Sequence, residues 1–274
     1  MKEKILLVSD LAGYGKVALG ASMPILAHMG YELFNLPTAL VSNTLDYGDF
    51  YILPTTDYMK ETLQVWDRLG FSFDAISLGF MVSKDQVDLL RDYCQTKRAQ
   101  GVQVFLDPIM ADEGQLYNGM TQTTVDLMKS LAREADYLVP NYTEACLLAG
   151  LAYCQEGLDW VGARALIRAL KDLSPGSFII SSCLLEGQSV NLVYNRKTGQ
   201  TTALPFDPVP LRFAGTGDIF NAYLTGRVLS GVPLEEAVQG AADFVLKLIC
   251  AQDEDAQAYK GLALEGHLHS LIQP

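Results

Sequence analysis

The chain has 274 residues, of which 49% are hydrophobic and 19% are charged, and this composition excludes a disordered protein. A formal net charge of −12 disfavours a nucleic acid or an anionic membrane as partner, because both are bound through clustered basic residues. Five separated cysteines without a CxxC pair are typical of free thiols in a reducing compartment, and no apolar run reaches the length of a membrane span, so we expect a cytoplasmic protein.

Strands and helices alternate along the first two thirds of the chain. Short aliphatic runs that end in polar residues predict buried parallel strands, and the segments between them predict helices. The predicted strands are 4–10, 33–43, 73–80, 102–108, 135–141 and 176–182, with helices at 21–30, 84–101, 142–150 and 159–173. A hairpin at 189–206 and two long helices, 217–231 and 234–251, follow. We therefore expect one α/β domain, 1–274, around a mostly parallel central sheet.

Polar residues gather at the carboxyl ends of these predicted strands. Open α/β sheets bind ligands beyond these ends, so the pattern predicts a cleft along one edge of the sheet. Ordinary polar loops would explain part of it, but they explain less well two acidic positions and an asparagine on consecutive strand ends. The residues at the strand ends are Ser9, Asp10, Ser42, Asn43, Gly79, Phe80, Asp107, Asn141, Ser181 and Ser182.

The segment AGTGD (214–218) places two glycines and a carboxylate directly before a predicted helix. Gly215 and Gly217 would let the backbone turn so that successive N–H groups point at one oxygen, and the helix dipole would add positive potential. The alternative is an ordinary helix cap made by Thr216 or Asp218.

Two further segments carry carboxylates near strand ends. PNYTEA (140–145) opens a helix with Asn141 and Glu144, and DPIMAD (107–112) contains Asp107 and Asp112. These groups could hold a hydrated Mg²⁺, which takes few protein ligands. The alternatives are compensation of the helix dipole and a surface loop. The chain has neither a GxxxxGK[ST] motif nor a correctly spaced GxGxxG, which disfavours a P-loop or a nicotinamide site.

Several segments in order resemble the ribokinase-like (PfkB) superfamily, and within it the pyridoxal/pyridoxamine kinase family. The segments are SDLAGYGKVALGASMPIL, PTALVSNTLDYGDF, DPIMADEGQLYNG, ADYLVPNYTEA and GTGDIFNAYLTG. The resemblance covers nearly the whole chain and implies a three-layer αβα sandwich. It also implies an ATP-dependent kinase that phosphorylates the 5′-hydroxymethyl group of a vitamin B6 vitamer and so feeds pyridoxal 5′-phosphate salvage.

The resemblance assigns roles in phosphoryl transfer to the last of these motifs and to the acidic segments. Asp218 would accept the proton of the alcohol, and the amides of Gly215, Thr216 and Gly217 would hold the transferred phosphoryl group. Glu144 would organise Mg²⁺ through water, and Asp112 would contribute to the same network.

The resemblance also assigns ligand contacts. The residues implied to contact ATP are Asn141, Ser181, Ser182 and Arg212, and those implied around the vitamer are Ser9, Asp10, Asn43, Tyr47 and Phe80. Lys16, Lys84 and Arg212 are the candidates for offsetting the charge of ATP. The family implies a homodimer and a monovalent cation such as K⁺.

Two positions depart from the pattern of pyridoxal kinases and leave the preferred vitamer open. Leu45 stands where a threonine is common, and Phe80 stands where many relatives have tyrosine. Two alternatives therefore remain. One is a hydroxymethylpyrimidine (phosphate) kinase or sugar kinase on the same scaffold, and the other is a catalytically silent relative that binds a vitamer.

Overall fold

The computed structural model describes residues 3–252 and 258–272. It divides the chain into two compact units, Met1–Val82 with Pro208–Pro274, and Ser83–Asp207. The single domain expected from the sequence remains a prediction.

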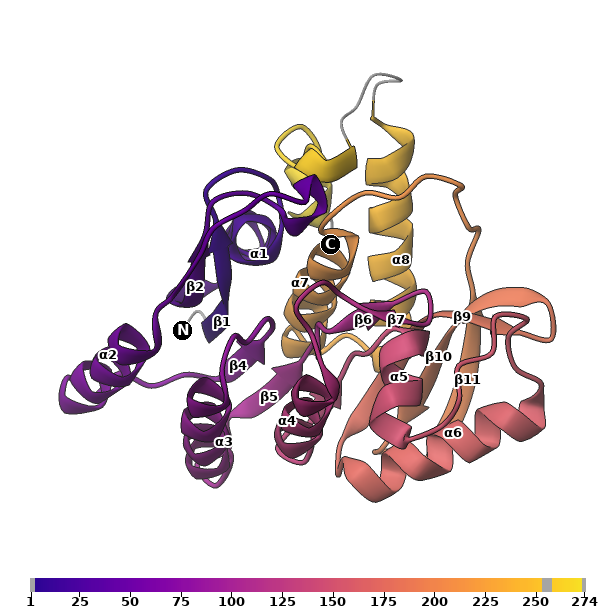
Figure 1. Ribbon diagram of the computed structural model, residues 1–274, viewed down its shortest axis with the longest axis horizontal. Helices are drawn as coiled ribbons and strands as arrows, with labels where there is room; N and C mark the ends of the chain where they lie inside the picture. Colours follow the sequence, from indigo (N-terminus) through magenta and orange to yellow (C-terminus); the bar gives the residue numbers. More distant parts are fainter. Residues whose placement is uncertain (1–2, 253–257, 273–274) are drawn as a thin grey trace. The chain divides into compact units, whose positions relative to one another are not determined.

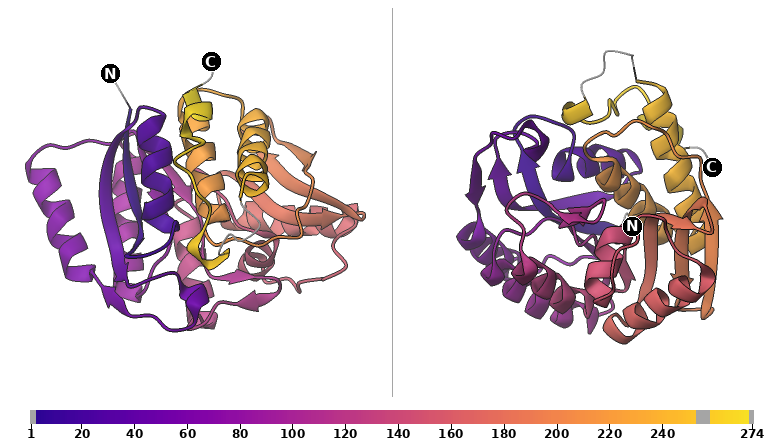
Figure 2. Two further views of the ribbon diagram at one scale, coloured as in Figure 1. Left: turned by 90° about the horizontal axis from the view of Figure 1, so that it is seen from above. Right: turned by 45° about the vertical axis from the view of Figure 1, so that its right-hand side comes forward.

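The first unit is built on a four-stranded sheet. Strand β1 lies between β4 and β2 and is parallel to both, and β3 joins β2 in the antiparallel sense. Figures 1 and 2 show α1 on one face of this sheet and α2 on the other, with α7 packed on α1 and α8 on α7. The elements are β1 (Lys4–Ala12), α1 (Ala18–His28), β2 (Glu32–Val41), β3 (Ile52–Pro54), α2 (Thr56–Arg68), β4 (Ala75–Leu78), α7 (Thr216–Leu229) and α8 (Leu234–Cys250).

The core of this unit lies between β1, α1, α7 and α8. The aliphatic run of β1 supplies Ile5 and Leu7, and α1 supplies Leu19 and Ile25; all four side chains are buried in one cluster. Burial of such side chains contributes roughly 1.5–3 kcal/mol each, so this cluster holds β1 against α1 and α7.

The second unit contains a five-stranded mixed sheet. Strands β5, β8 and β9 run parallel, and β9, β10 and β11 form successive antiparallel pairs. Helices α3, α4, α5 and α6 follow one another as neighbours (Figure 1). The elements are α3 (Lys84–Arg98), β5 (Gln103–Leu106), β6 (Ala111–Asp112), β7 (Gln115–Leu116), α4 (Gln122–Ala132), β8 (Tyr137–Leu138), α5 (Tyr142–Ala149), α6 (Trp160–Leu173), β9 (Ser177–Leu185), β10 (Gln188–Asn195) and β11 (Gln200–Pro205).

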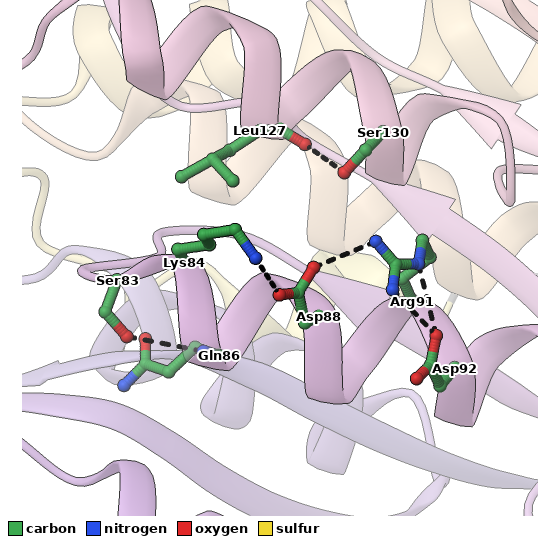
Figure 3. A network of polar contacts seen from close by, with 8 residues as sticks. All are labelled: Ser83, Lys84, Gln86, Asp88, Arg91, Asp92, Leu127 and Ser130. Carbon is green, nitrogen blue, oxygen red and sulfur yellow. Dashed lines mark hydrogen bonds and ion pairs between the residues drawn. The ribbon is translucent and has the colours of Figure 1, made fainter.

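Helix α3 shows how local sequence sets an element. The hydroxyl of Ser83 caps the helix by accepting from the N–H of Gln86 at 3.3 Å. Along the exposed face, Asp88 pairs with Lys84 and with Arg91 (Figure 3). These interactions hold the pKa of Asp88 below its usual range, with the hydrogen bond from Lys84 as the largest cause.

The structure confirms the predicted α/β class, the mostly parallel arrangement and the hairpin at 189–206. Strand β1 runs two residues beyond the predicted end, to Ala12. Helices α2 and α4, strand β3 and the β6–β7 hairpin were not predicted. Helix α2 buries only Met59 and Leu63, so its hydrophobic pattern is sparse. Strands β6 and β7 have two residues each, which is too short for an alternating pattern.

Across residues 3–252 and 258–272, no helix combines the length and the apolar character that a bilayer crossing requires. All five cysteines are free thiols, as the sequence predicted.

Candidate active site

In the first unit, polar groups meet where β1 and β4 end. The hydroxyl of Ser9 accepts from the N–H of Phe80 at 3.2 Å and donates to Asp10 Oδ1 at 3.5 Å. Thr38 on β2 donates to the carbonyl of Phe80 at 2.8 Å. Three of the predicted substrate residues, Ser9, Asp10 and Phe80, are therefore brought together. Thr38, which was not predicted from the sequence, holds the backbone of Phe80 in place.

Helix α7 begins at AGTGD without a side-chain cap. Its N-cap is Gly215, with φ of +80°, and a Cβ there would lie 2.2 Å from the carbonyl oxygen of Lys16. The hydroxyl of Thr216 donates to the carbonyl of Phe213 at 3.4 Å, so it does not cap the helix. The structure thus disfavours the helix-cap alternative and leaves the first amides of α7 to be satisfied by water or a ligand.

The two glycines of this turn differ. Gly215 alone has a positive φ, whereas Gly217 lies within the helix, where a Cβ would meet nothing within 4 Å. The sequence-based expectation that both glycines make the sharp turn is therefore wrong for Gly217. A small residue at this position still lets a large ligand group approach the amides.

Asp218 lies half-buried in the first turn of α7. Burial raises its pKa to about 6, and the backbone N–H of Ala18, which donates to the carboxylate, opposes that rise. Ala18 has φ of +50°, which is unusual for alanine and typical of residues held at functional sites. The sequence carried no signal for this contact.

Asp10 lies close enough to Asp218 for the two carboxylates to repel each other. Burial, followed by this repulsion, raises the pKa of Asp10 to about 7. Near neutral pH, Asp218 is therefore mostly ionised and able to accept a proton, while Asp10 is partly protonated.

The remaining predicted vitamer residues lie on the loop after β2. Asn43 holds this loop together, because its amide donates to the carbonyls of Thr44 at 3.2 Å and Asp49 at 3.0 Å. The ring of Tyr47 lies 6.2 Å from that of Tyr14 and 5.6 Å from that of Tyr259, between ring centroids. The structure therefore gives Asn43 a role in loop shape and places Tyr47 in a surface cluster of tyrosines.

In the second unit, Asn141 and Glu144 form a capping box at the start of α5. Glu144 is buried and accepts from the N–H groups of Asn141 at 2.9 Å, Met110 at 3.0 Å and Ala111 at 3.4 Å. Asn141 donates from its amide to the carbonyl of Ala111 at 2.7 Å. The two side chains therefore fasten the DPIMAD loop to α5.

Burial raises the pKa of Glu144 well above its usual range, and repulsion by Asp107 raises it further. The electrostatic partner of Glu144 is thus Asp107, to which the family resemblance assigned no role in the metal network. Asp112 lies on β6, where its Oδ1 accepts from the N–H of Glu113 at 2.9 Å. Whether Asp112 joins the metal network stays a prediction.

A divalent cation fits this arrangement. Within the part of the chain that the structure describes, no three His, Cys, Asp or Glu side chains form a cage for a metal ion. Mg²⁺ commonly uses one or two carboxylates and completes its octahedron with water and phosphate oxygens. The mutual repulsion of Asp107 and Glu144 is the kind of electrostatic strain that such an ion relieves.

Three of the residues predicted to contact ATP, Asn141, Ser181 and Ser182, lie together near Glu144. The N–H of Ser181 on β9 donates to the carbonyl of Pro140 at 2.9 Å, and Ser181 forms a bridge with Asn141. The register of β9 against β10 shifts here, and Ser182 has φ of +56°. Bulges of this kind redirect side chains next to functional sites.

The three candidate cations differ in their surroundings. Lys16 forms an ion pair with Glu265, and Lys84 pairs with Asp88 one helical turn away (Figure 3). Arg212 is exposed on the segment that precedes α7. Lys16 and Lys84 would have to leave their present partners in order to contact ATP.

One family profile and several known proteins match nearly the full length of the chain. The profile described as phosphomethylpyrimidine kinase matches residues 27–261. The chain belongs to this family. A pyridoxal kinase from Rubrobacter xylanophilus is 28% identical to it over 257 residues, which cover 89% of this chain and 86% of that protein.

Solved structures of this family agree with the fold. A structure from Bacteroides thetaiotaomicron, described as a phosphomethylpyrimidine kinase and crystallised with pyridoxal, has a TM-score of 0.92 and 31% identity, covering 100% of this chain and 97% of that one. A pyridoxal kinase from Lactobacillus plantarum has a TM-score of 0.88 and 25% identity, covering 98% and 96% of the two chains. The predicted membership in the kinase superfamily is confirmed.

The turn before α7 gives a direct test of this site. Gly215→Ala forces a left-handed alanine against the Lys16 carbonyl, and we expect a loss of about 2–3 kcal/mol in the free energy of unfolding. Gly217→Ala is the matched control, and we expect its stability to equal or exceed that of the wild type. Urea denaturation measures both. Equal stabilities for the two variants would contradict the described turn.

Proposed function

We propose that the protein is an ATP-dependent kinase that phosphorylates the 5′-hydroxymethyl group of a vitamin B6 vitamer. The observation that carries this proposal is the start of α7, where uncapped amides and the carboxylate of Asp218 occupy a single turn. Its support includes relatives named as pyridoxal kinases and a family structure crystallised with pyridoxal. The product would enter pyridoxal 5′-phosphate salvage.

In this proposal, Asp218 orients the hydroxyl of the vitamer and takes its proton as the new O–P bond forms. The amides of Gly215, Thr216 and Gly217 hold the phosphoryl oxygens, on which negative charge builds. Such donors typically contribute roughly 3–4 kcal/mol each to stabilisation of the transition state. The carboxylate and the anion-binding amides thus act on different partners: one on the attacking alcohol and the other on the phosphoryl group.

The second unit would serve the nucleotide. We assign ATP contacts to Asn141, Ser181 and Ser182 of this unit, and to Arg212 of the first unit. Glu144 and Asp107 would hold Mg²⁺, largely through water, and Asp112 is a further candidate for that network. A bound Mg²⁺ neutralises phosphate charge. A monovalent cation, a homodimeric state and a cytoplasmic location complete the proposal.

A second candidate function is phosphorylation of hydroxymethylpyrimidine or its phosphate, which the description of the matching family favours. A Haemophilus influenzae kinase of that name is 26% identical over 216 residues. A panel of B6 vitamers and pyrimidines at fixed MgATP separates the two functions. Tight vitamer binding without ADP release would instead indicate a catalytically silent relative.

Asp218→Asn tests the catalytic base. We expect kcat/KM to fall by about 10²–10⁴-fold, because amide nitrogen and oxygen cannot take the proton. We expect the melting temperature to stay equal or rise at pH 8, because the variant lacks a buried charge. A variant with near wild-type turnover would show that Asp218 is not the base.

The pH dependence of the wild type gives a separate test. The base must be unprotonated, and burial raises the pKa of Asp218 to about 6. We therefore expect log kcat/KM to fall as the pH drops below about 6, with a slope approaching one per pH unit. A profile that stays flat down to pH 4 would contradict this assignment.

Asp107→Asn and Asp112→Asn form a matched pair that tests the metal site. Both remove one carboxylate from the same segment, but Asp107 is the partner of Glu144. We expect Asp107→Asn to raise the Mg²⁺ concentration needed for half-maximal rate by about tenfold, and Asp112→Asn to have a smaller effect. Equal Mg²⁺ requirements in both variants and the wild type would count against a role for Asp107.

A further inference from the structure

Asp10 is a predicted vitamer contact, but the proposed mechanism does not say which group of the vitamer it meets. Asp10 lies beside the proposed base Asp218, and the two carboxylates repel each other. The Oδ1 of Asp10 accepts from the hydroxyl of Ser9 at 3.5 Å. A second carboxylate next to a catalytic base makes it harder for both groups to be ionised. We therefore expect Asp10 to bind a group of the ligand.

The backbone holds both carboxylates in place. Asp10 lies where the register between β1 and β2 shifts, between the pairs Ser9↔Pro37 and Leu11↔Leu40. Asp218 is fixed by the N–H of Ala18 and by the tight turn at Gly215. Both residues therefore lie on packed backbone, Asp10 in β1 and Asp218 in the first turn of α7.

Within residues 3–252 and 258–272, no basic side chain forms an ion pair with Asp10 or Asp218. Lys16, on the loop that follows β1, forms an ion pair with Glu265 instead. Positive charge supplied by a ligand would relieve the repulsion between the two carboxylates.

The chemistry of the vitamers indicates which ligand group meets Asp10. Pyridoxal, pyridoxine and pyridoxamine share one ring and differ only at carbon 4, which carries an aldehyde, a hydroxymethyl or an aminomethyl group. Carbon 4 is bonded to carbon 5, which bears the hydroxymethyl group that is phosphorylated. An acceptor whose 5′ oxygen contacts Asp218 therefore brings its carbon-4 substituent next to the base.

We propose that Asp10 determines specificity by pairing with a cationic group on carbon 4, so that the site favours pyridoxamine over pyridoxine and pyridoxal. The inference rests on the proposed vitamer kinase activity. The ammonium group donates a charge-assisted hydrogen bond to Asp10 and lowers the repulsion between the two carboxylates. The neutral substituents of the other vitamers cannot do this.

The test compares kcat/KM for pyridoxamine and pyridoxine in the wild type, Asp10→Asn and Asp57→Asn. Asp57 lies exposed on α2, so its variant removes one negative charge from the same unit but away from the pair. We expect the wild type to favour pyridoxamine by about tenfold or more, a typical range for one charged hydrogen bond. Asp10→Asn should lower this ratio at least tenfold, mainly through KM for pyridoxamine, and Asp57→Asn should keep it.

Two further measurements separate this inference from the kinase proposal and from misfolding. Calorimetric Kd values for pyridoxamine and pyridoxine, measured without ATP, test the pairing of Asp10 with the ammonium group even if no turnover occurs. The melting temperature of Asp10→Asn at pH 8 should equal or exceed that of the wild type, because the variant lacks a repelled charge. Equal kcat/KM for the two vitamers, or a proportional loss for both in Asp10→Asn, would overturn the inference. Phosphorylation of no vitamer would instead overturn the kinase proposal.

Discussion

The close contact between the loop before α1 and the start of α7 is the constraint on which the rest of the site depends. The carbonyl of Lys16 lies where a side chain at Gly215 would project, and the N–H of Ala18 reaches the carboxylate of Asp218. This contact aims the carboxylate and leaves the first amides of the helix uncapped. It also brings Asp218 near Asp10 at the end of β1, so one backbone arrangement sets both the geometry and the electrostatics of the proposed acceptor site.

In the second unit, backbone contacts also hold a carboxylate in place, here at the proposed metal site. The carboxylate of Glu144 is buried, and three backbone N–H groups hold it between α5 and the DPIMAD loop. Asp107 repels this buried carboxylate, and a bound cation can offset the repulsion. A structural capping box and a metal-binding role are therefore compatible, because the N–H groups fix the carboxylate while water can link it to the ion.

Sequence reasoning predicted the parts of the site that depend on residue type and position. These parts are the strand-end residues Ser9 and Asp10 and the segment AGTGD. They could be recognised because patterns of glycine and carboxylate residues can be read from the sequence alone. The positive φ of Ala18, the strained Ser182 in a bulge, and the pairing of Glu144 with Asp107 could not. Each of these depends on tertiary contacts between segments distant in the chain, and helix α2 was missed because its buried face holds only two side chains.

A ¹³C NMR titration of the aspartate carboxyl carbons tests the electrostatic coupling of Asp10 and Asp218 most directly. The structure predicts that burial raises the pKa of Asp218 to about 6, and that burial and repulsion by Asp218 raise the pKa of Asp10 to about 7. In Asp218→Asn, the pKa of Asp10 should fall, because the repelling charge is gone. Titration of both groups near the ordinary aspartate pKa of about 4, with no change in the variant, would contradict the account.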